Sequence, residues 1–337
     1  IGIDEDGENV KLTLQLFSPS AKGNETIDTS ADNAKIISAT GKTVSEAFEN
    51  ATLKQGKKIF IGHNRIIIFG NEIAKSGLAD VLSYFSSNPF SRQDTHLLVA
   101  EKTANEILTT KIKQAIIPAE AIEDMILNFN ENGFTADVMF FNFMSAFSNN
   151  NQSAFLPIIK LKKESGEKNE DKIETISNIY LDGTAIFKDK KMSASINKTD
   201  TRGLLFMRDE IKKTTYLAKT EKFDFASVEI YKSSVKIIPD VNGEKIAFKI
   251  EITCDANLED FSVKNGATYS DIPSLEKAVE EEIASECMSA FNETVIKEKA
   301  DIIFLGDEIW QQKVNFWKKL ENNWQDNCDK IKITVVP

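Results

Sequence analysis

The chain has 337 residues, enough for two or three compact domains, and its 41% hydrophobic and 28% charged residues are typical of a globular protein. Its formal net charge of -11 repels phosphate backbones, so nucleic acid is not an expected partner. The longest apolar runs, such as "RIIIF", are far shorter than the ~20 residues of a membrane-spanning helix. Three widely spaced cysteines, Cys254, Cys287 and Cys328, match neither a disulfide framework nor a zinc site, and we expect them to be free.

Strands and helices alternate from the start of the chain. Apolar residues at every second position from 10 to 16 predict a half-buried strand, and a polar loop follows over 18–33. Residues 36–39 predict another strand, and Thr43 with Glu46 is the capping-box pattern that begins a helix. This alternation indicates a mixed α/β domain.

The same alternation continues beyond residue 100. A strand rich in Ile and Phe is expected over 57–70, an amphipathic helix over 71–88 and a short strand over 95–100. Thr103 with Glu106 repeats the capping-box pattern before a further helix. We place all these elements in one N-terminal domain.

A charged segment ends this domain. Residues 142–147 predict an apolar helix, and residues 154–163 are expected to be extended because Pro157 biases its neighbour away from the helical region. Residues 162–172, "KKESGEKNEDK", carry no apolar side chain and are predicted to form a solvated loop or linker. We therefore assign residues 1–172 to an N-terminal mixed α/β domain.

The segment "YLDGTAIFKDKKMSASINKTDTRGLLFM", residues 180–207, is more specified than its polar surroundings. Two alternating runs separated by "KDKK" predict a short meander, with a turn set by Gly183 and with Phe187 packed inside. We assign residues 173–215 to a small central β-rich domain built on this segment.

The chain is expected to leave this meander at "NKTDTRG". Thr199 or Thr201 is predicted to cap a helical turn, and Gly203 permits a close backbone approach that a side chain would block. Arg202 beside Asp200 either pins this corner through a fork of hydrogen bonds or faces a partner. Both alternatives stay open.

Residues 216–337 are assigned to a C-terminal α/β domain. Two long alternating runs joined at Asn242 and Gly243 predict a β-hairpin. A helix is expected to begin near residues 270–271, with Pro273 in its first turn and with apolar residues four apart on its buried side.

Three tryptophans mark the last predicted helix, over residues 310–324. Trp310, Trp317 and Trp324 lie at helical spacing, which favours packing against the core. A partner interface is the main alternative, because Trp is enriched at interface hot spots, and a sugar or aromatic ligand is another. A strand over 330–336 is the last predicted element.

No catalytic arrangement is present in the sequence. His63 and His96 are the only histidines, and neither accompanies a serine elbow, a cysteine at a recognisable spacing or an H-E-x-x-H pattern. We interpret both as structural. The acidic run Glu280–Glu282 is expected on the exposed side of its helix, and phosphate-binding glycine loops are absent. We therefore predict no catalytic residue, no metal site and no cofactor.

Several stretches, taken in order, resemble one family. They are "IGID", "IGHNRIIIFGNEIAKSGLADVLSYF" with "SRQDTHLLVAEKTANEIL", "FLPIIKLKK", "DGTAIFKDKKM" with "TDTRGLL", and "ADIIFLGDEIWQQKVNFWKKLENNW". This ordered set is similar to that of the spore germination C-subunit family (GerAC-like), the lipoprotein component of nutrient germinant receptors. The resemblance covers essentially the whole chain.

The resemblance implies a mixed α/β protein of three domains that a lipid holds to the outer face of the spore inner membrane. It implies two membrane-embedded receptor subunits as partners there, with small nutrient germinants acting on the complex. The family's signal peptide and lipidated cysteine would precede Ile1, so this anchor is implied and not seen. The family usually has a Glu where this chain has Asp200, and we expect the corner to persist with a slightly altered reach.

Two functions stay open. The first is a non-enzymatic lipoprotein subunit of a spore germinant receptor. The alternative is an extracytoplasmic lipoprotein that itself captures a small nutrient in an interdomain cleft. A hydrolase comes third, because Ser, Asp and His have no recognisable order. The candidate partner or motif residues are His63, Arg65, Gly183, Thr184, Phe187, Asp200, Thr201, Arg202, Gly203, Trp310 and Trp317.

Overall fold

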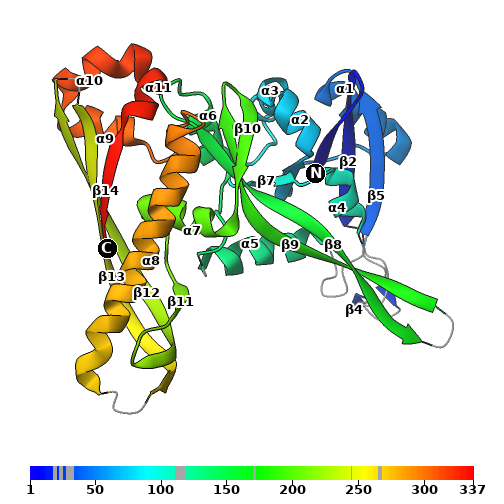
Figure 1. The fold of residues 1–337 in the computed structure, drawn as a ribbon. Coiled ribbons are helices and arrows are strands. Elements are labelled where there is room, and N and C mark those ends of the chain that lie inside the picture. Colours follow the sequence, from blue (N-terminus) through cyan, green and yellow to red (C-terminus); the bar gives the residue numbers. More distant parts are fainter. Residues whose placement is uncertain are drawn as a thin grey trace.

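The structure is a computed structural model, and it describes residues 1–17, 21–22, 26–27, 34–110, 118–131, 133–169, 172–243, 245–264 and 268–337. Two larger β-sheets, each with helices packed against it, lie side by side, and the helix α7 (Lys198–Met207) lies between them (Figure 1). This arrangement confirms the mixed α/β fold class. None of the helices in these ranges is long and apolar enough to cross a bilayer.

The N-terminal sheet has eight strands in the order β10-β9-β8-β7-β6-β1-β2-β5. The pairs β1–β6, β6–β7 and β7–β8 are parallel, and the others are antiparallel. All residues of β6 and β7 are buried, as expected for parallel strands covered on both faces. The strands are β1 (Gly2–Asp6), β2 (Asn9–Phe17), β5 (Ala34–Gly41), β6 (Ile66–Phe69), β7 (His96–Ala100), β8 (Ala154–Asn169), β9 (Lys172–Lys188) and β10 (Lys191–Ile196).

The polar loop predicted over 18–33 lies outside the described residues, apart from β3 (Ala21–Lys22) and β4 (Thr26–Ile27), which pair with each other.

The helices of this half begin where local signals predict them. The Thr43 Oγ1 atom accepts a hydrogen bond from the Glu46 N–H at 3.2 Å, and Gly56 ends the same helix with a φ of 71°. Thr103 caps α4 in the same way. The helices are α1 (Val44–Gln55), α2 (Asn71–Ser76), α3 (Ala79–Ser87), α4 (Ala104–Thr109), α5 (Pro118–Glu131) and α6 (Phe140–Phe147).

Two predicted elements differ from the observed ones. The strand predicted over 57–70 is only β6, because a turn precedes it in which the Asn64 N–H donates to the Ile61 carbonyl at 2.9 Å. The helix predicted over 71–88 is two helices, because Gly77 has a φ of 132°, which no helix contains.

The prediction of a solvated loop or linker over 162–172 is wrong. The strands β8 and β9 pair as far as Asn169 and Lys172, so this segment is the end of a two-stranded arm that extends beyond the sheet (Figure 1). A charged segment without apolar residues can form such an arm, because the ladder satisfies backbone hydrogen bonds without a buried face.

The predicted meander is the hairpin of β9 and β10. Its turn residues Asp189 and Lys190 have φ of 49° and 65°, which suits the twist of a tight hairpin. Both strands belong to the N-terminal sheet, whereas β11 (Thr214–Ala218) belongs to the C-terminal sheet. The segment 173–215 therefore has no sheet of its own among the described residues. The three-domain division stays a prediction about which parts fold independently.

The C-terminal sheet has the strand order β11-β12-β13-β14, and α8 packs along it (Figure 1). The predicted hairpin is confirmed as β12 and β13, with Gly243 in the turn at a φ of 59°. The predicted apolar stripe of α8 is buried, from Leu275 to Phe291. The elements are β12 (Phe223–Asn242), β13 (Lys245–Val263), η1 (Tyr269–Asp271), α8 (Ile272–Phe291), η2 (Asn292–Ile296) and β14 (Lys332–Val336).

The prediction of a single helix over 310–324 is wrong, because this segment contains several short helices. The backbone breaks at Lys313, which has φ of -141° and ψ of 51°, and a new helix begins there. The break leaves Trp310 55% exposed, while Trp317 and Trp324 pack edge to face with ring centres 5.3 Å apart. The pieces are α9 (Leu305–Gln312), α10 (Val314–Leu320), η3 (Glu321–Asn323), α11 (Trp324–Asn327) and η4 (Cys328–Lys330).

Candidate functional site

The helix α7 is enclosed between the two halves of the protein. Each of its residues from Asp200 to Met207 is buried. A Cβ atom at Gly203 would lie 2.3 Å from the Glu286 carbonyl oxygen, so only glycine allows α7 and α8 to approach this closely. We call α7, residues 182–184 of β9 and residues 282–287 of α8 the joint.

The N-terminus of α7 differs from the prediction. Asn197 is its N-cap, and Thr199 and Thr201 lie inside the helix. The Asn197 Oδ1 atom accepts from the Asp200 N–H at 2.9 Å, and its Nδ2 donates to the Asp200 carboxylate at 2.8 Å. The Asp200 carboxylate is thus part of the cap, and the predicted fork between Asp200 and Arg202 is wrong.

Arg202 pairs with Glu286 of α8 instead. Its Nε donates to Glu286 Oε2 at 2.9 Å and its Nη2 donates to Oε1, which makes a bidentate ion pair. The two side chains are only 11% and 6% exposed. Of the two alternatives for Arg202, the structure shows the internal one, in which hydrogen bonds hold the corner. The carboxylate that accepts them is Glu286 and not Asp200.

Tyr216 of β11 completes this cluster. Its hydroxyl donates to Glu286 Oε2 at 2.7 Å, and the Arg202 guanidinium lies 3.9 Å from the centre of its ring. Burial and the neighbouring Glu286 carboxylate raise the pKa of Tyr216 far above its usual range. The phenol therefore remains a neutral hydrogen-bond donor to the carboxylate.

Sequence reasoning missed Glu286, although a signal was present. Glu286 follows Ile283 by three residues and precedes Cys287, and both of these are buried positions of α8. Helical spacing puts a residue so placed on the same buried face. A carboxylate on such a face indicates an ion pair with a distant residue, because a buried charge needs a partner.

The DGT segment fastens α7 to the N-terminal sheet. Gly183 has a φ of 87°, and a Cβ atom there would lie 2.4 Å from the Ile196 carbonyl oxygen. The Thr184 and Thr201 hydroxyls are hydrogen-bonded at 2.9 Å, and Phe187 packs against Phe143 with ring centres 5.2 Å apart. The motif is therefore an internal connection between β9 and α7.

Three candidate residues lie on the surface, away from the joint. His63 is exposed, with its ring edge to face on Phe60 at 5.6 Å, and Trp310 is 55% exposed. Arg65 forms an ion pair with Glu123. The predicted residues thus do not form one site. The structure brings together only Gly183, Thr184, Asp200, Thr201, Arg202 and Gly203.

The described residues show no chemistry that would point to an enzyme or a metal centre. No group of His, Cys, Asp and Glu in them is placed to bind a metal ion, and the three cysteines are free. His96 is buried and hydrogen-bonded through Nδ1 to Asp137 at 2.7 Å, as a structural histidine would be. Glu280–Glu282 are exposed, as expected.

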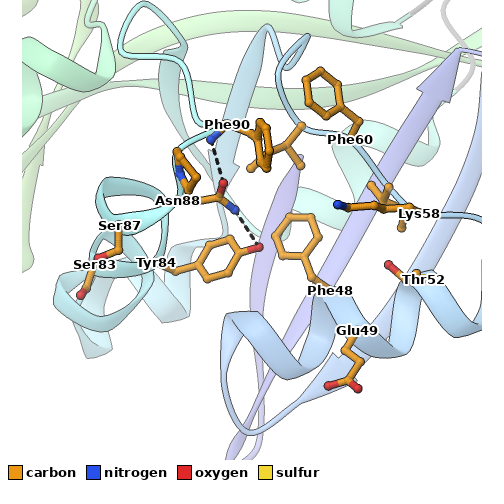
Figure 2. Close-up of a pocket in the computed structure, with 13 residues that line it drawn as sticks. Phe48, Glu49, Thr52, Lys58, Phe60, Ser83, Tyr84, Ser87, Asn88 and Phe90 are labelled. Carbon is orange, nitrogen blue, oxygen red and sulfur yellow. Dashed lines mark hydrogen bonds between the residues drawn. The ribbon is translucent and has the colours of Figure 1, made fainter.

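A second feature is a hollow of about 660 Å³ at the surface of the N-terminal half, which Figure 2 shows. Phe48 of α1 stacks on Tyr84 of α3 with ring centres 5.1 Å apart, and Phe60 meets Phe90 edge to face at 5.4 Å. These four rings, together with Lys58, form what we call the aromatic groove. Its lining comes from α1, α3 and two loops, so no single stretch of sequence announces it.

One loop of the aromatic groove is held by hydrogen bonds between residues that are close in the sequence. The Phe90 N–H donates to Asn88 Oδ1 at 2.9 Å, and Asn88 Nδ2 donates to the Tyr84 hydroxyl at 3.3 Å (Figure 2). Phe60 and Phe90 nevertheless remain 55% and 50% exposed. The groove is therefore open, with the rings of Phe60 and Phe90 exposed at its edge.

Two sheets held together by a buried joint, with an open aromatic groove at the surface of the N-terminal half, are the features that the structure defines. Two family models match this chain in order: the spore germination protein N-terminal domain over residues 1–161, and the spore germination B3/GerAC-like C-terminal domain over residues 182–337. The chain therefore belongs to the GerAC family of spore germination proteins, which confirms the resemblance.

Curated relatives agree with this assignment. Spore germination protein B3 of Bacillus subtilis is 23% identical over 97% of this chain and 85% of its own length. Spore germination protein GerQC of Bacillus cereus is 24% identical over 89% of this chain and 80% of its own length. The crystal structure of the GerBC protein has the same fold, with a TM-score of 0.64 at 17% identity over 99% of this chain and 94% of that one.

Proposed function

We propose that this chain is the lipoprotein subunit of a spore nutrient germinant receptor. The observation that carries the proposal is the match of both family models, in order, over residues 1–161 and 182–337. In this role the chain is non-enzymatic, and an N-terminal lipid holds it to the outer face of the spore inner membrane. It assembles there with two membrane-embedded subunits, and small nutrients act on the complex as a whole.

The joint suits a subunit that transmits position. α7 contacts β9 on one side and α8 on the other, so the two halves share one buried helix. Packed interiors transmit displacement because they have little free volume. A partner that binds one half therefore orients the other half as well.

Trp310 is the candidate partner contact of the C-terminal half. It is 55% exposed at the end of α9, and Val314 at the start of α10 is 44% exposed. Exposed tryptophan is enriched among the residues that dominate protein interfaces. Trp317, by contrast, is buried and supports the fold.

Co-purification from spore membranes tests this proposal, using the full-length lipidated protein with Trp310→Ala and a matched Phe141→Ala variant, since Phe141 is 64% exposed on α6. We expect the wild type and Phe141→Ala to carry the two partners, Trp310→Ala to carry fewer, and deletion of the gene to slow nutrient-triggered germination. The proposal is wrong if the lipidated protein never co-purifies with partners and its deletion leaves germination unchanged.

A second function, nutrient capture between the halves, is favoured by one observation. A hollow of about 200 Å³ lies between α6 and the C-terminal half, and Arg208 is held there between the rings of Phe155 and Phe304 at 4.8 and 4.4 Å. This volume suits a molecule the size of an amino acid. Calorimetry with amino acids, sugars and nucleosides distinguishes the two functions: saturable binding that Arg208→Ala removes supports capture, and its absence supports the scaffold.

A further inference from the structure

The rim of the aromatic groove is apolar and faces solvent. Leu53, in the last turn of α1, is 74% exposed, Phe60 is 55% exposed and Phe90 is 50% exposed. They come from three separate segments, yet Phe60 and Phe90 touch each other, and Leu53 directly follows Thr52, which lines the hollow. Large apolar side chains gathered in this way mark an interaction surface.

The charge beside these side chains is opposite to that of the whole protein. Lys57 and Lys58 are both exposed, and the Lys58 ammonium lies 5.8 Å from the centre of the Phe90 ring. Among the described residues, no carboxylate lies within ion-pair distance of either lysine, and Glu49 is the acidic residue of the lining. These two lysines give the edge of the groove a local positive charge, on a chain whose net charge is -11.

We infer that the aromatic groove and its two lysines form a membrane-contact face that takes anionic lipid. Exposed Phe and Leu side chains suit the boundary between head groups and acyl chains, where apolar side chains are buried. Lysines immediately beside them meet the negative head groups.

Ile1 lies beside the loop that carries Phe60. The Ile1 nitrogen donates to the Ile66 carbonyl at 3.0 Å and lies 3.5 Å from Asn64 Oδ1, at the end of the loop that carries Phe60. The inference rests on the proposed function in one respect, since a lipidated subunit already lies at the bilayer surface. One acyl chain gives only marginal binding, and the groove supplies the second contact.

Vesicle flotation of the chain without any lipid anchor tests the inference. We use phosphatidylcholine vesicles with and without phosphatidylglycerol, at low and at physiological salt. We expect binding to the anionic vesicles that weakens with salt. Phe60→Ser/Phe90→Ser and Lys57→Glu/Lys58→Glu should each lower the bound fraction at least about tenfold.

Two matched controls accompany these variants. Phe141→Ser removes an equally exposed ring on α6, and Lys318→Glu/Lys319→Glu reverses an exposed lysine pair on α10; both should bind like the wild type. Circular dichroism confirms that each variant is folded. The inference is overturned if anionic vesicles do not bind the wild type, or if the controls lose binding as the groove variants do.

A protein partner is the competing occupant of the groove. If the wild type ignores vesicles while Phe60→Ser/Phe90→Ser stops co-purification with the membrane-embedded subunits, the groove is a protein interface and the lipid inference is wrong. Because flotation uses neither anchor nor partner subunits, its failure leaves the proposed function standing.

Discussion

Arg202 and Glu286 lie 84 positions apart in the sequence and meet in a bidentate pair between α7 and α8. Because both side chains are nearly enclosed, the removal of one charge strands the other in a medium that solvates it poorly. Lysine is no substitute for Arg202, since an ammonium cannot make two parallel hydrogen bonds to one carboxylate.

We predict that Arg202→Met lowers the free energy of unfolding by about 3–5 kcal/mol. Arg202→Met combined with Glu286→Gln should recover part of this loss, because no unpaired charge remains and Gln still accepts from Tyr216. Urea denaturation measures both. Lys245→Met, which breaks an exposed pair with Asp240, is the control and should change little. Equal losses in the single and double variants would contradict the prediction.

His96 gives a pH dependence of stability. Its hydrogen bond to Asp137 raises its pKa above the ordinary value of 6.5, against the opposing effect of burial, and the charges of Asp137, Glu123 and Asp94 add to the increase. The folded protein thus binds this proton more tightly than the unfolded chain does. The resulting stabilisation is present below pH 6.5 and is lost as the pH rises through the higher folded pKa.

We therefore predict that His96→Asn destabilises the protein more at pH 6 than at pH 8.5. Urea denaturation series across this range measure the difference between wild type and variant. His63→Asn, at an exposed histidine, is the control and should change the free energy of unfolding little. A His96 difference that grows with pH would refute the assignment of this ion pair.

At the scale of elements, the contact of α7 with α8 depends on one missing side chain. Inside an isolated helix, Gly→Ala is favourable by about 1 kcal/mol. At Gly203 the new methyl group would meet the backbone of Glu286 and Cys287, at 2.3 Å and 2.8 Å from its nearest atoms. Backbone cannot rotate away as a side chain can, so the two helices must separate.

We expect Gly203→Ala to destabilise the protein by about 1–3 kcal/mol, the reverse of the helix-propensity expectation. Amide hydrogen exchange should accelerate in Leu204–Met207 at the same time. Gly243→Ala, in a hairpin turn where a Cβ atom would meet nothing within 4 Å, should leave exchange in α7 unchanged. A stabilised Gly203→Ala variant would show that the helices can part without cost.

Elements fixed by neighbouring residues were predictable. The N-caps at Thr43 and Thr103 and the Asn242-Gly243 hairpin act over two to four residues, and the structure has all three. The breaks at Gly77 and Lys313 were not, because periodic apolar residues continue across both. What decides them is which surface each following helix packs against, and this depends on distant parts of the chain.

The candidate site, too, was predictable only where its residues are fixed by their neighbours in the sequence. The DGT and TDTRG segments could be recognised because the local backbone conformation at a chain reversal favours glycine and threonine. Helical spacing could have placed Glu286 on the buried side of α8, but its partner Arg202 and the aromatic groove come from segments that only the fold brings together. Asp200 was wrongly paired for a local reason, because its carboxylate accepts from the Asn197 cap three residues earlier.

In the whole molecule, one cluster of buried apolar residues runs from the N-terminal sheet through α7 to the C-terminal sheet. The N-terminal sheet itself is closed by strands that follow residue 172, since β8 pairs along most of its length with β9 and at only two positions with β7. A cut at residue 172 would therefore leave β8 without its main partner.

We predict that a fragment of residues 1–197, which keeps all eight strands, has a cooperative urea transition. A fragment of residues 1–172 should have none, because the unpaired edge of β8 exposes backbone and apolar residues such as Leu156. Circular dichroism against urea measures both. Cooperative unfolding of the shorter fragment would support the boundary at 172 that the sequence suggested.

Cys287 lies in the joint, and its reaction with an alkylating reagent can report whether the joint is closed. Its thiol donates to the Gly203 carbonyl at 3.5 Å, and burial raises its pKa well above the usual range, so it is neither accessible nor ionised while α7 rests on α8. An alkylating reagent can reach it only when the two helices part. The rate at which this sulfur is alkylated therefore measures how often the two halves separate. Half-exposed Cys254 is the internal reference.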